Sequence, residues 1–552
     1  MLNNKLKSSY TVLVLIIFFV TYLISIKNLS PTSINWLLYD ETAQSYIGWA
    51  FFRQSDLLQW PLFLNNVDGI SVNSSIAYSA SNPLISIPLK YVLYPFQEIH
   101  IQFHSIWIII IFLLQYLTFR KILLHYYISG YILEVSSILV IVQPFWLFRL
   151  RLGHIDGMAH FLILAAIYGY IKKAGSKYWL LIIIISAAIH PYLNVMVFSI
   201  YLLSLVTSQD KSKYIKFKSF LVVTFSNVIS LIFSGFLDLN NTKVSMGGYG
   251  LFKTNLNSFV DSGVDLGDGL KHQYSFLIPD LAQNIGDYEG YSFLGLGIFI
   301  ALAVVLLNFR RIEIDRTAFL SKNFVYLFLF AVCLYILSLS NNFDFGKTRL
   351  FTLPNIPLVS TFFEYFRVSA RFSWPLIYLC LIIVLVTYNK IQAKKIVLEL
   401  GITLILVIQV IDTLPLISEI HNTYNNRSSW DTKLNLTNWN SVIQKNKIDR
   451  IIMVNPVNNP VLNIDISKLA LDNDIKVNFG YFARVDQRII ERQYRMFSLV
   501  LINGVLDKQS IYLLKGEDQI HAFQSGIKPK CTSFFREKDY LVVYYSRCAK
   551  SE

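Results

Sequence analysis

The feature that most constrains this chain is a series of long apolar segments between Thr11 and Pro415. Of its 552 residues, 54% are hydrophobic and only 15% are charged, and the mean hydropathy is +0.47. Recurring segments of this kind are typical of helices that cross the hydrocarbon core of a bilayer. The sequence therefore predicts an α-helical polytopic membrane protein with about eleven transmembrane helices, near residues 11–27, 102–119, 130–147, 157–171, 178–189, 191–206, 219–236, 292–308, 323–339, 372–388 and 396–414.

Basic residues indicate how these helices are oriented. Lys5 and Lys7 precede the first segment, and Lys/Arg clusters follow alternate segments, at residues 120–121, 172–177, 211–218, 310–322 and 390–395. Short cytoplasmic loops carry an excess of Lys and Arg, so eleven crossings place every cluster on the cytoplasmic side. We expect a bacterial inner (plasma) membrane protein with a cytoplasmic N-terminus and a periplasmic or otherwise extracytoplasmic C-terminus. The first segment is interpreted as an uncleaved anchor, because no small-residue cleavage pattern follows it.

The same topology predicts two domains. Residues 1–415 form a transmembrane module with outer loops at 28–101 and 237–291, and residues 416–552 form a soluble extracytoplasmic domain. Residues 82–96 do not cross and are predicted to form a helix at the outer membrane surface. Short β-like runs among helical patterns indicate that the C-terminal domain is a small α/β unit. On an oxidising face of the membrane, Cys531 and Cys548 could form a disulfide.

Polar residues that could carry chemistry fall on the outer side of this topology. In the first outer loop, Asp40 and Glu41 head a segment whose Tyr46, Trp49 and Ala50 have helical spacing, and Arg53 follows. A helix at the membrane interface fits this pattern. The alternative is that the two acids are ordinary capping residues at a helix N-terminus.

A second group lies between two apolar segments. Arg149 and Arg151 stand at the outer end of one segment, against the positive-inside bias, and His154, Asp156 and His160 follow. An anion on this side would explain the positive charge. The alternatives are interfacial residues that contact lipid phosphates, an Asp156–His160 pair on one helical face, and a metal site.

A third group is the pair Arg367 and Arg371, four residues apart, so that one helix would place both guanidinium groups on the same face. Planar guanidinium groups suit bidentate phosphate binding. The alternative is an ion pair between Arg367 and Glu364. His190 lies at another outer helix end, where Pro191 could simply break the helix.

These motifs, taken in order, resemble the GT-C superfamily of integral membrane glycosyltransferases, which use polyprenyl-phosphate-linked sugars. The resemblance rests on YIGWAFFR (46–53), WPL (60–62), RLGHIDGMAHFLILAA (151–166), HPYL (190–193) and FRVSARFSWP (366–375), and it covers residues 30–415. It implies a GT-C-like transmembrane fold and a carboxylate in the first outer loop that acts as catalytic base or metal ligand. Asp40 matches that position, with Glu41 as its neighbour or substitute. The loop contains no Asp-x-Asp pair and so departs from the metal-dependent version of the superfamily; a divalent cation as cofactor stays open.

The resemblance implies transfer of a sugar from a polyprenyl-phosphate donor to an envelope glycan or a lipid-linked acceptor on the outer face of the membrane. A base would take the proton of the acceptor hydroxyl while the anomeric carbon gains oxocarbenium character. Arginines would stabilise the departing lipid phosphate. We assign catalysis to Asp40 and Glu41, and substrate binding to a set of basic residues comprising Arg53, Arg149, Arg151, His154, His190, Arg367 and Arg371.

Other interpretations stay open at this point. A transporter or flippase of a lipid-linked substrate would place polar residues near the bilayer midplane and show internal repeats. A membrane acyltransferase would use His154 or His190 as its base, and a non-catalytic assembly protein would bind glycan or a partner. The sequence contains no nucleic-acid-binding module, no Walker loop and no dinucleotide fingerprint.

Overall fold

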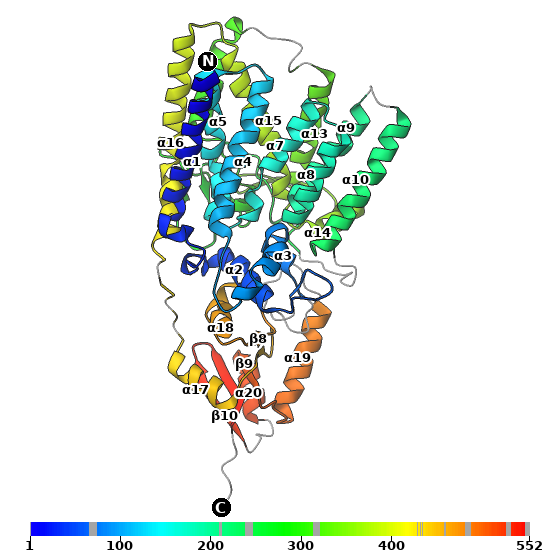
Figure 1. Cartoon of the computed structure of the whole chain (residues 1–552), viewed down its shortest axis with the longest axis vertical. Coiled ribbons are helices and arrows are strands. Elements are labelled where there is room, and N and C mark those ends of the chain that lie inside the picture. Colours follow the sequence, from blue (N-terminus) through cyan, green and yellow to red (C-terminus); the bar gives the residue numbers. More distant parts are fainter. Residues whose placement is uncertain are drawn as a thin grey trace, which may run out of the picture. The chain divides into compact units, whose positions relative to one another are not determined.

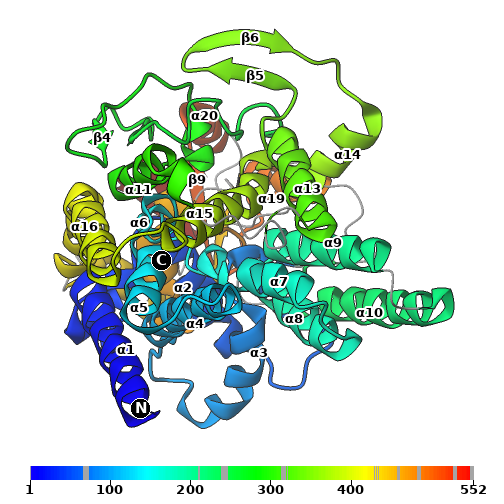
Figure 2. The same ribbon diagram turned by 90° about the horizontal axis from the view of Figure 1, so that it is seen from above.

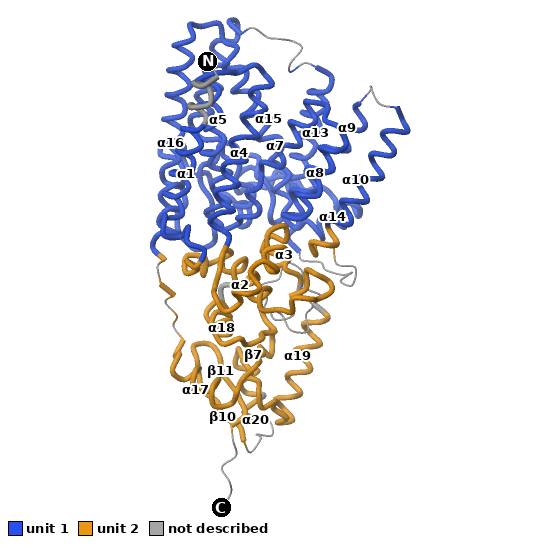
Figure 3. The backbone as a smooth tube through the Cα atoms, in the orientation of Figure 1, with its two compact units in different colours: residues 1–31, 103–230, 245–426 blue, residues 32–102, 231–244, 427–552 orange. Residues whose placement is uncertain are grey.

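The chain forms two compact units, which Figure 3 shows in different colours. Unit 1 comprises residues 1–31, 103–230 and 245–426, and unit 2 comprises residues 32–102, 231–244 and 427–552. The computed structural model describes residues 2–65, 74–208, 212–237, 247–312, 319, 321–427, 429–430, 432, 434–456, 460–480, 487–525 and 531–546.

Unit 1 is built mainly from helices (Figure 1). Its α-helices are α1 (Leu2–Ile24), α4 (His104–His125), α5 (Gly130–Ile138), α6 (Pro144–Arg151), α7 (Phe161–Ile171), α8 (Ser176–Ile189), α9 (Pro191–Thr207), α10 (Lys213–Phe233), α11 (Leu296–Leu307), α13 (Lys322–Ser338), α14 (Pro357–Tyr365), α15 (Trp374–Asn389) and α16 (Lys395–Asn425). Short 3-10 helices connect them: η1 (Ile26–Leu29), η5 (Leu139–Val142), η6 (Asp156–Met158), η7 (Asp287–Gly290), η8 (Phe309–Arg311) and η9 (Ser369–Ser373).

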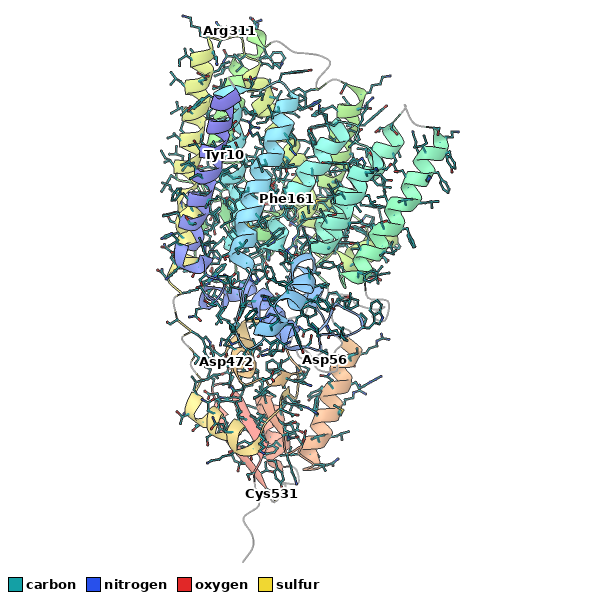
Figure 4. All side chains as sticks on the ribbon, in the orientation of Figure 1. Tyr10, Asp56, Phe161, Arg311, Asp472 and Cys531 are labelled. Atoms are coloured by element: carbon teal, nitrogen blue, oxygen red, sulfur yellow. The ribbon has the colours of Figure 1, made fainter. Side chains whose placement is uncertain are left out.

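The core of unit 1 surrounds α15, which packs against α4, α11 and α13 (Figure 2). Most of its side chains from Trp374 to Tyr388 are buried. On one side of the unit, α1 runs alongside α16, and the outward-facing Tyr10 of α1 is exposed (Figure 4). By contrast, Phe161 at the start of α7 is buried among the helices. A helix that is apolar on every side, as α15 is, belongs inside a helical bundle.

Four helical segments of the described chain are long and apolar enough to cross a membrane: α4, α10, Ser369–Asn389 and α16. The segments Gly130–Val142 and Pro144–Arg151, bent by 42° relative to each other, count as a fifth if they form one span. The other apolar helices are α7 with the turn before it, α8, α9, α11, α13 and the described part of α1, and they have 10–17 residues. Seventeen residues rise only about 25 Å, less than the ~30 Å hydrocarbon core. The predicted apolar segments are helical, but a count of eleven transmembrane helices is not supported.

The break between the segments 178–189 and 191–206 is confirmed. Helix α8 ends at Ile189 and α9 begins at Pro191, with His190 extended between them (φ −158°, ψ 128°). Proline is favoured at the first position of a helix because that position needs no backbone donor. His190 is thereby fixed at a corner between two helices.

The described part of the second long loop that belongs to unit 1 contains short elements. Strands β3 (Gly263–Val264) and β4 (His272–Gln273) pair antiparallel, and η7 follows just before α11. A second hairpin, β5 (Asn342–Phe345) with β6 (Thr348–Thr352), connects α13 to α14.

Unit 2 joins the first long loop to the C-terminal residues. The predicted domain boundary at 415/416 lies inside α16, whereas residues 32–102 belong to the same unit as residues 427–552. The elements from the first loop are η2 (Asn35–Leu37), α2 (Asp40–Gln54), β1 (Leu64–Asn65), β2 (Ser74–Ser75), η3 (Ile76–Ser79), α3 (Pro83–Val92) and η4 (Tyr94–Phe96). Helix α2 packs against α18 (Pro460–Asp472), which explains why the loop and the C-terminal region form one unit.

The helix predicted after Asp40 and Glu41 is therefore present as α2, and all of its residues from Thr42 to Arg53 are buried. Gly48 lies where α2 packs tightly against η3, since a Cβ atom at this position would lie 2.2 Å from Ser79 Oγ. The predicted helix within residues 82–96 is present as α3 and η4.

The C-terminal part of unit 2 contains a mixed five-stranded sheet, which confirms the sheet predicted from the short β-like runs. Its order is β10-β11-β9-β7-β8, where β7 pairs parallel with β8 and β9, and β11 pairs antiparallel with β9 and β10. The strands are β7 (Arg450–Met453), β8 (Lys476–Val477), β9 (Ser510–Lys515), β10 (Thr532–Glu537) and β11 (Tyr540–Tyr545). The remaining helices are α17 (Leu436–Asn446), α19 (Gln487–Ile502) and α20 (Glu517–Ser525).

Of the cysteines, Cys531 at the edge of β10 is disulfide-bonded, while Cys333 and Cys380 are free. The predicted partner, Cys548, lies outside the described residues.

Candidate functional site

Two of the predicted arginines meet at one carboxylate inside unit 1. Arg149, in the last turn of α6, donates from Nη1 to Glu289 Oε2 at 2.6 Å. Arg371, in η9, donates from Nη2 to Glu289 Oε1 at 2.9 Å. We call these three residues the arginine–glutamate centre.

The arginine–glutamate centre is buried and carries an excess positive charge. The side chains of Arg149, Glu289 and Arg371 are 1%, 6% and 11% exposed. Taken together, the two guanidinium groups and the carboxylate of these three residues sum to a charge of +1 in a buried position. In addition, Arg149 Nε is buried without a hydrogen-bond partner among the described residues. A buried group of this kind favours a further anion.

Glu289 is held ionised by its neighbours. Burial alone would raise the pKa of this carboxyl, but Arg371, Arg149 and His154 together lower the pKa well below its usual range. A carboxylate with so low a pKa is not a general base at neutral pH. Its role in the centre is to position the two guanidinium groups.

Aromatic rings and a neutral histidine surround the centre. The guanidinium of Arg371 lies 4.8 Å from the ring centre of Tyr192, and that of Arg149 lies 5.6 Å from the ring centre of Trp374. His190 Nδ1 is buried without a hydrogen-bond partner among the described residues. Burial, together with the positive charge of Arg371, lowers the pKa of His190 well below its usual range, so its imidazole is neutral.

The loop that supplies Glu289 is anchored by a second buried ionic group. Lys253 Nζ lies 2.9 Å from Asp287 Oδ1 and 2.9 Å from Asp344 Oδ2, and all three side chains are at most 2% exposed. Asn255 Nδ2 donates to the other oxygen of Asp287 at 2.9 Å. Because Asp287 begins η7, these bonds fix the backbone two residues before Glu289.

Arg151 has a different partner from Arg149. It forms an ion pair with Glu419 of α16, and Glu419 Oε1 also lies 3.2 Å from His272 Nδ1. His272 Nε2 lies 2.9 Å from Asp268 Oδ2. Hydrogen bonds raise the pKa of His272 above its usual value, the one with Glu419 more than the one with Asp268. The structure therefore places Arg151 in a bridge between the second loop and α16, and does not bring it to the arginine–glutamate centre.

The pairing of Asp156 with His160, one of the alternatives left open by the sequence, is not found among the described residues. His160 Nδ1 bonds to Tyr378 Oη at 2.9 Å, while Trp107 Nε1 donates to Asp156 Oδ1 at 3.0 Å. Residues 156–158 form the 3-10 helix η6 and α7 begins only at Phe161, so the two side chains do not share a helical face.

The expected placement of Arg367 and Arg371 on one helix is also wrong. Helix α14 ends at Tyr365 and η9 begins at Ser369, so Arg367 lies in the connection between them. Its guanidinium lies 5.8 Å from the ring centre of Phe252. In the described part of the chain, no ion pair links Arg367 to Glu364.

Asp40 and Glu41 occupy the first turn of α2 in unit 2. Asp40 has a φ of 46°, in the left-handed region, where residues with a Cβ atom are uncommon. Residues in such conformations are found more often at functional sites than elsewhere. Arg53, at the other end of α2, donates to Ile99 O at 2.7 Å and to Phe96 O at 2.6 Å. Arg53 thus closes the loop against α2, in contrast to the substrate-binding role expected for it.

Glu289, Glu419 and Tyr192 are not among the functional residues predicted from the sequence. Glu289 lies immediately before an apolar segment, at the same kind of position that singled out Arg149. An acidic residue of the second loop near the start of an apolar segment is therefore the sequence signal that indicates Glu289. Among the described residues, no group of three or more His, Cys, Asp or Glu side chains could hold a metal ion. A divalent cation stays a prediction.

Comparisons with known proteins give a family without an assigned activity. Residues 12–414 match a family model described as a domain of unknown function (DUF6311), and residues 438–545 match a second one, the DUF6311 C-terminal domain. Neither a search of curated proteins nor a search of solved structures found a significant match. Since the first match alone covers well over half of the residues, the chain belongs to the DUF6311 family.

Proposed function

We propose that this protein is a membrane-embedded glycosyltransferase that moves a sugar from a polyprenyl-phosphate donor to an envelope glycan or lipid-linked acceptor. In this proposal the protein lies in a bacterial plasma membrane with its N-terminus in the cytoplasm. The reaction takes place on the outer face. The order of the motifs and the apolar helices of unit 1 are consistent with a GT-C-like enzyme.

The observation that carries the proposal is the arginine–glutamate centre, with its buried net charge of +1. When the bond between the anomeric carbon and the phosphate oxygen breaks, the departing lipid phosphate gains negative charge. Fixed guanidinium groups in a poorly hydrated site bind this state better than the ground state, and so lower the barrier. Glu289 already aligns both groups, which means that little reorganisation is needed when the anion forms.

The proposal assigns the proton-accepting role to Asp40. Its carboxylate would take the proton of the acceptor hydroxyl as the acceptor oxygen bonds to the anomeric carbon and the lipid phosphate leaves with the bonding electrons. Glu41 is the neighbouring carboxylate that could substitute for it. Arg149, Arg371 and Arg367 bind phosphate in this proposal, and neutral His190, with His154, orients the sugar.

Translocation of a lipid-linked substrate is a second candidate function. One observation favours it, namely a polar chain inside the helical core of unit 1. Gln115, in the middle of α4, donates to Tyr378 Oη at 2.8 Å, and Tyr378 bonds in turn to His160. All three side chains are fully buried. Polar residues far from helix ends are typical of transport pathways.

The test is sugar transfer by the full chain reconstituted in lipid vesicles with radiolabelled polyprenyl-phosphate sugars and an acceptor extract. Asp40→Asn should abolish transfer while the folded protein inserts normally. The matched control is Asp56→Asn, which removes an exposed carboxylate from the same unit (Figure 4) and should transfer sugar at the wild-type rate. Full activity of Asp40→Asn would end the assignment. Movement of labelled lipid across the vesicle membrane without any transfer would instead support the second candidate.

A further inference from the structure

Unit 2 contains a cavity of about 230 Å³ beside the start of α2. It is smaller than the ~300–1,000 Å³ typical of sites for drug-sized ligands, and so suits a single small ring. The cavity is lined by residues from the first loop, the segment before α17, α18 and the β10–β11 hairpin, namely Leu38, Tyr39, Leu434, Ile464, Asp465, Ile466, Glu537, Lys538 and Tyr540.

Two carboxylates in the cavity wall are held in place by hydrogen bonds. Glu537, which is 7% exposed, accepts from Trp439 Nε1 at 3.1 Å and from the backbone of Asn435 at 3.0 Å, both through Oε2. No described residue donates a hydrogen bond to its Oε1. Asp465 accepts from Trp430 Nε1 at 3.2 Å and from Lys538 Nζ at 3.2 Å. Each carboxylate oxygen can accept a further bond, so both groups can serve a ligand that donates hydrogen bonds.

The charge of the cavity wall is opposite to that of the arginine–glutamate centre. Asp465, Glu537 and Lys538 sum to a net −1, since two carboxylates face one ammonium group. An anionic ligand would meet repulsion and lose its hydration. A neutral or amine-bearing ligand with several hydroxyl groups would instead donate to the carboxylates. The side chains of Tyr540 and Ile464 offer apolar surface for the faces of such a ring, whereas the guanidinium of Arg427 lies over the ring of Tyr39.

We propose that this cavity binds the acceptor as a single neutral or amino sugar residue. The inference rests on the proposed glycosyltransferase function and extends it, because it names the substrate class and assigns its site to unit 2. Tyr39 lines the cavity and is followed directly by Asp40, the carboxylate to which the proton of the acceptor hydroxyl is assigned. The two substrates are thus distinguished by charge, with the lipid phosphate recognised by arginines and the acceptor sugar by carboxylates.

The experiment is calorimetric titration of the purified full chain, without any donor, with methyl glycosides of glucose, galactose, mannose, glucosamine and N-acetylglucosamine. Inorganic phosphate serves as the anionic probe. At least one glycoside should bind, and phosphate should not compete with it. Asp465→Asn should weaken that binding about tenfold or more, because an amide replaces a charged acceptor. Ile464→Trp, which fills the cavity without changing its charge, should abolish it.

The matched control is Asp539→Asn, which removes an exposed carboxylate at the turn between β10 and β11 and should bind the glycoside as the wild type does. Failure of every glycoside to bind at millimolar concentration would overturn the inference, as would unchanged affinity in both Asp465→Asn and Ile464→Trp. Because no donor is present, the result is independent of the transfer assay. Transfer activity without glycoside binding would overturn this inference and leave the proposed function intact. Full transfer activity of Asp40→Asn would overturn the assignment of Asp40 and leave the binding result valid.

Discussion

The guanidinium group of Arg149 binds Glu289 at two places, the side-chain carboxylate and the backbone carbonyl oxygen. Nη1 donates to the carboxylate at 2.6 Å, and Nη2 donates to the carbonyl oxygen of the same residue at 2.7 Å. A single guanidinium group therefore fixes both the position and the orientation of η7 relative to α6. The planar, forked geometry of arginine makes this possible, and a lysine ammonium could not reproduce it.

We expect Glu289→Gln to destabilise unit 1 strongly. The change removes the one carboxylate between two buried guanidinium groups, and breaking a buried ionic group in this way costs about 3–5 kcal/mol. Thermal unfolding in detergent should show a clearly lowered midpoint. Glu364→Gln, on the exposed side of α14, should leave the midpoint unchanged. Equal midpoints for the two variants would show that Glu289 does not hold the centre together.

We expect Arg371→Lys to keep the fold and lose transfer activity. A lysine retains the charge opposite Glu289 but cannot keep both donors on a phosphate and a carboxylate together. Removing one preorganised donor of this kind costs about 10²–10³ in kcat. The measurement is kcat and KM for the lipid donor in vesicles. Lys347→Gln, which changes an exposed cation in the β5–β6 turn, is the control, and wild-type kcat in Arg371→Lys would remove Arg371 from the reaction.

The cluster of His272, Asp268 and Glu419 predicts a pH-dependent contribution to stability. The folded pKa of His272 is raised above the ordinary value of 6.5 by its two carboxylate partners. A raised pKa means that the protonated form is stabilised in the folded state, so the contribution is fully present below pH 6.5 and disappears as the pH rises through the folded pKa. Wild type should therefore unfold at a higher temperature than His272→Gln in mildly acidic buffer, with the gap closing in alkaline buffer. A gap that is independent of pH would contradict the ionic role.

Gly48 provides a test of the packing in unit 2. A Cβ atom at this position would lie 2.2 Å from Ser79 Oγ and 2.4 Å from Ser79 Cβ, so Gly48→Ala should destabilise the unit by about 1–3 kcal/mol. The double variant Gly48→Ala with Ser79→Gly should recover part of the loss. Gly175→Ala is the matched control, because a Cβ atom at Gly175 meets nothing within 4 Å. Limited proteolysis of the three variants would rank them, and an intact Gly48→Ala protein would refute the close approach.

The helices and the C-terminal strands could be predicted because both follow from local patterns. Hydrophobic periodicity over ten or more residues depends only on neighbours in the chain, and so does the break at His190 and Pro191. The selection of Arg149 and Arg371 also followed from local reasoning, since both stand at the ends of apolar segments. The number of membrane crossings could not be predicted in the same way. Helices of 10–17 residues are as apolar as membrane-spanning helices, but they are too short to cross a bilayer by length alone.

The partners of the charged residues could not be predicted in the same way. Arg149 and Arg151 are two residues apart on one helix, which separates their directions by about 200°. One consequently reaches Glu289 and the other Glu419. Likewise, the hydrogen bonds from Arg53 to the backbone carbonyls of Ile99 and Phe96 depend on how the first loop folds back on α2.

By itself the sequence determined that this chain forms apolar helices followed by a small α/β region, with arginines and carboxylates at segment ends, because those properties are written in short-range periodicity and composition. Only the tertiary structure decided that Glu289 lies between Arg149 and Arg371, and that residues near α2 share a cavity with the C-terminal sheet. The physical reason is that these contacts join residues far apart in the sequence, with 140 positions between Arg149 and Glu289 and 82 between Glu289 and Arg371, so that their meeting depends on how the helices and strands pack.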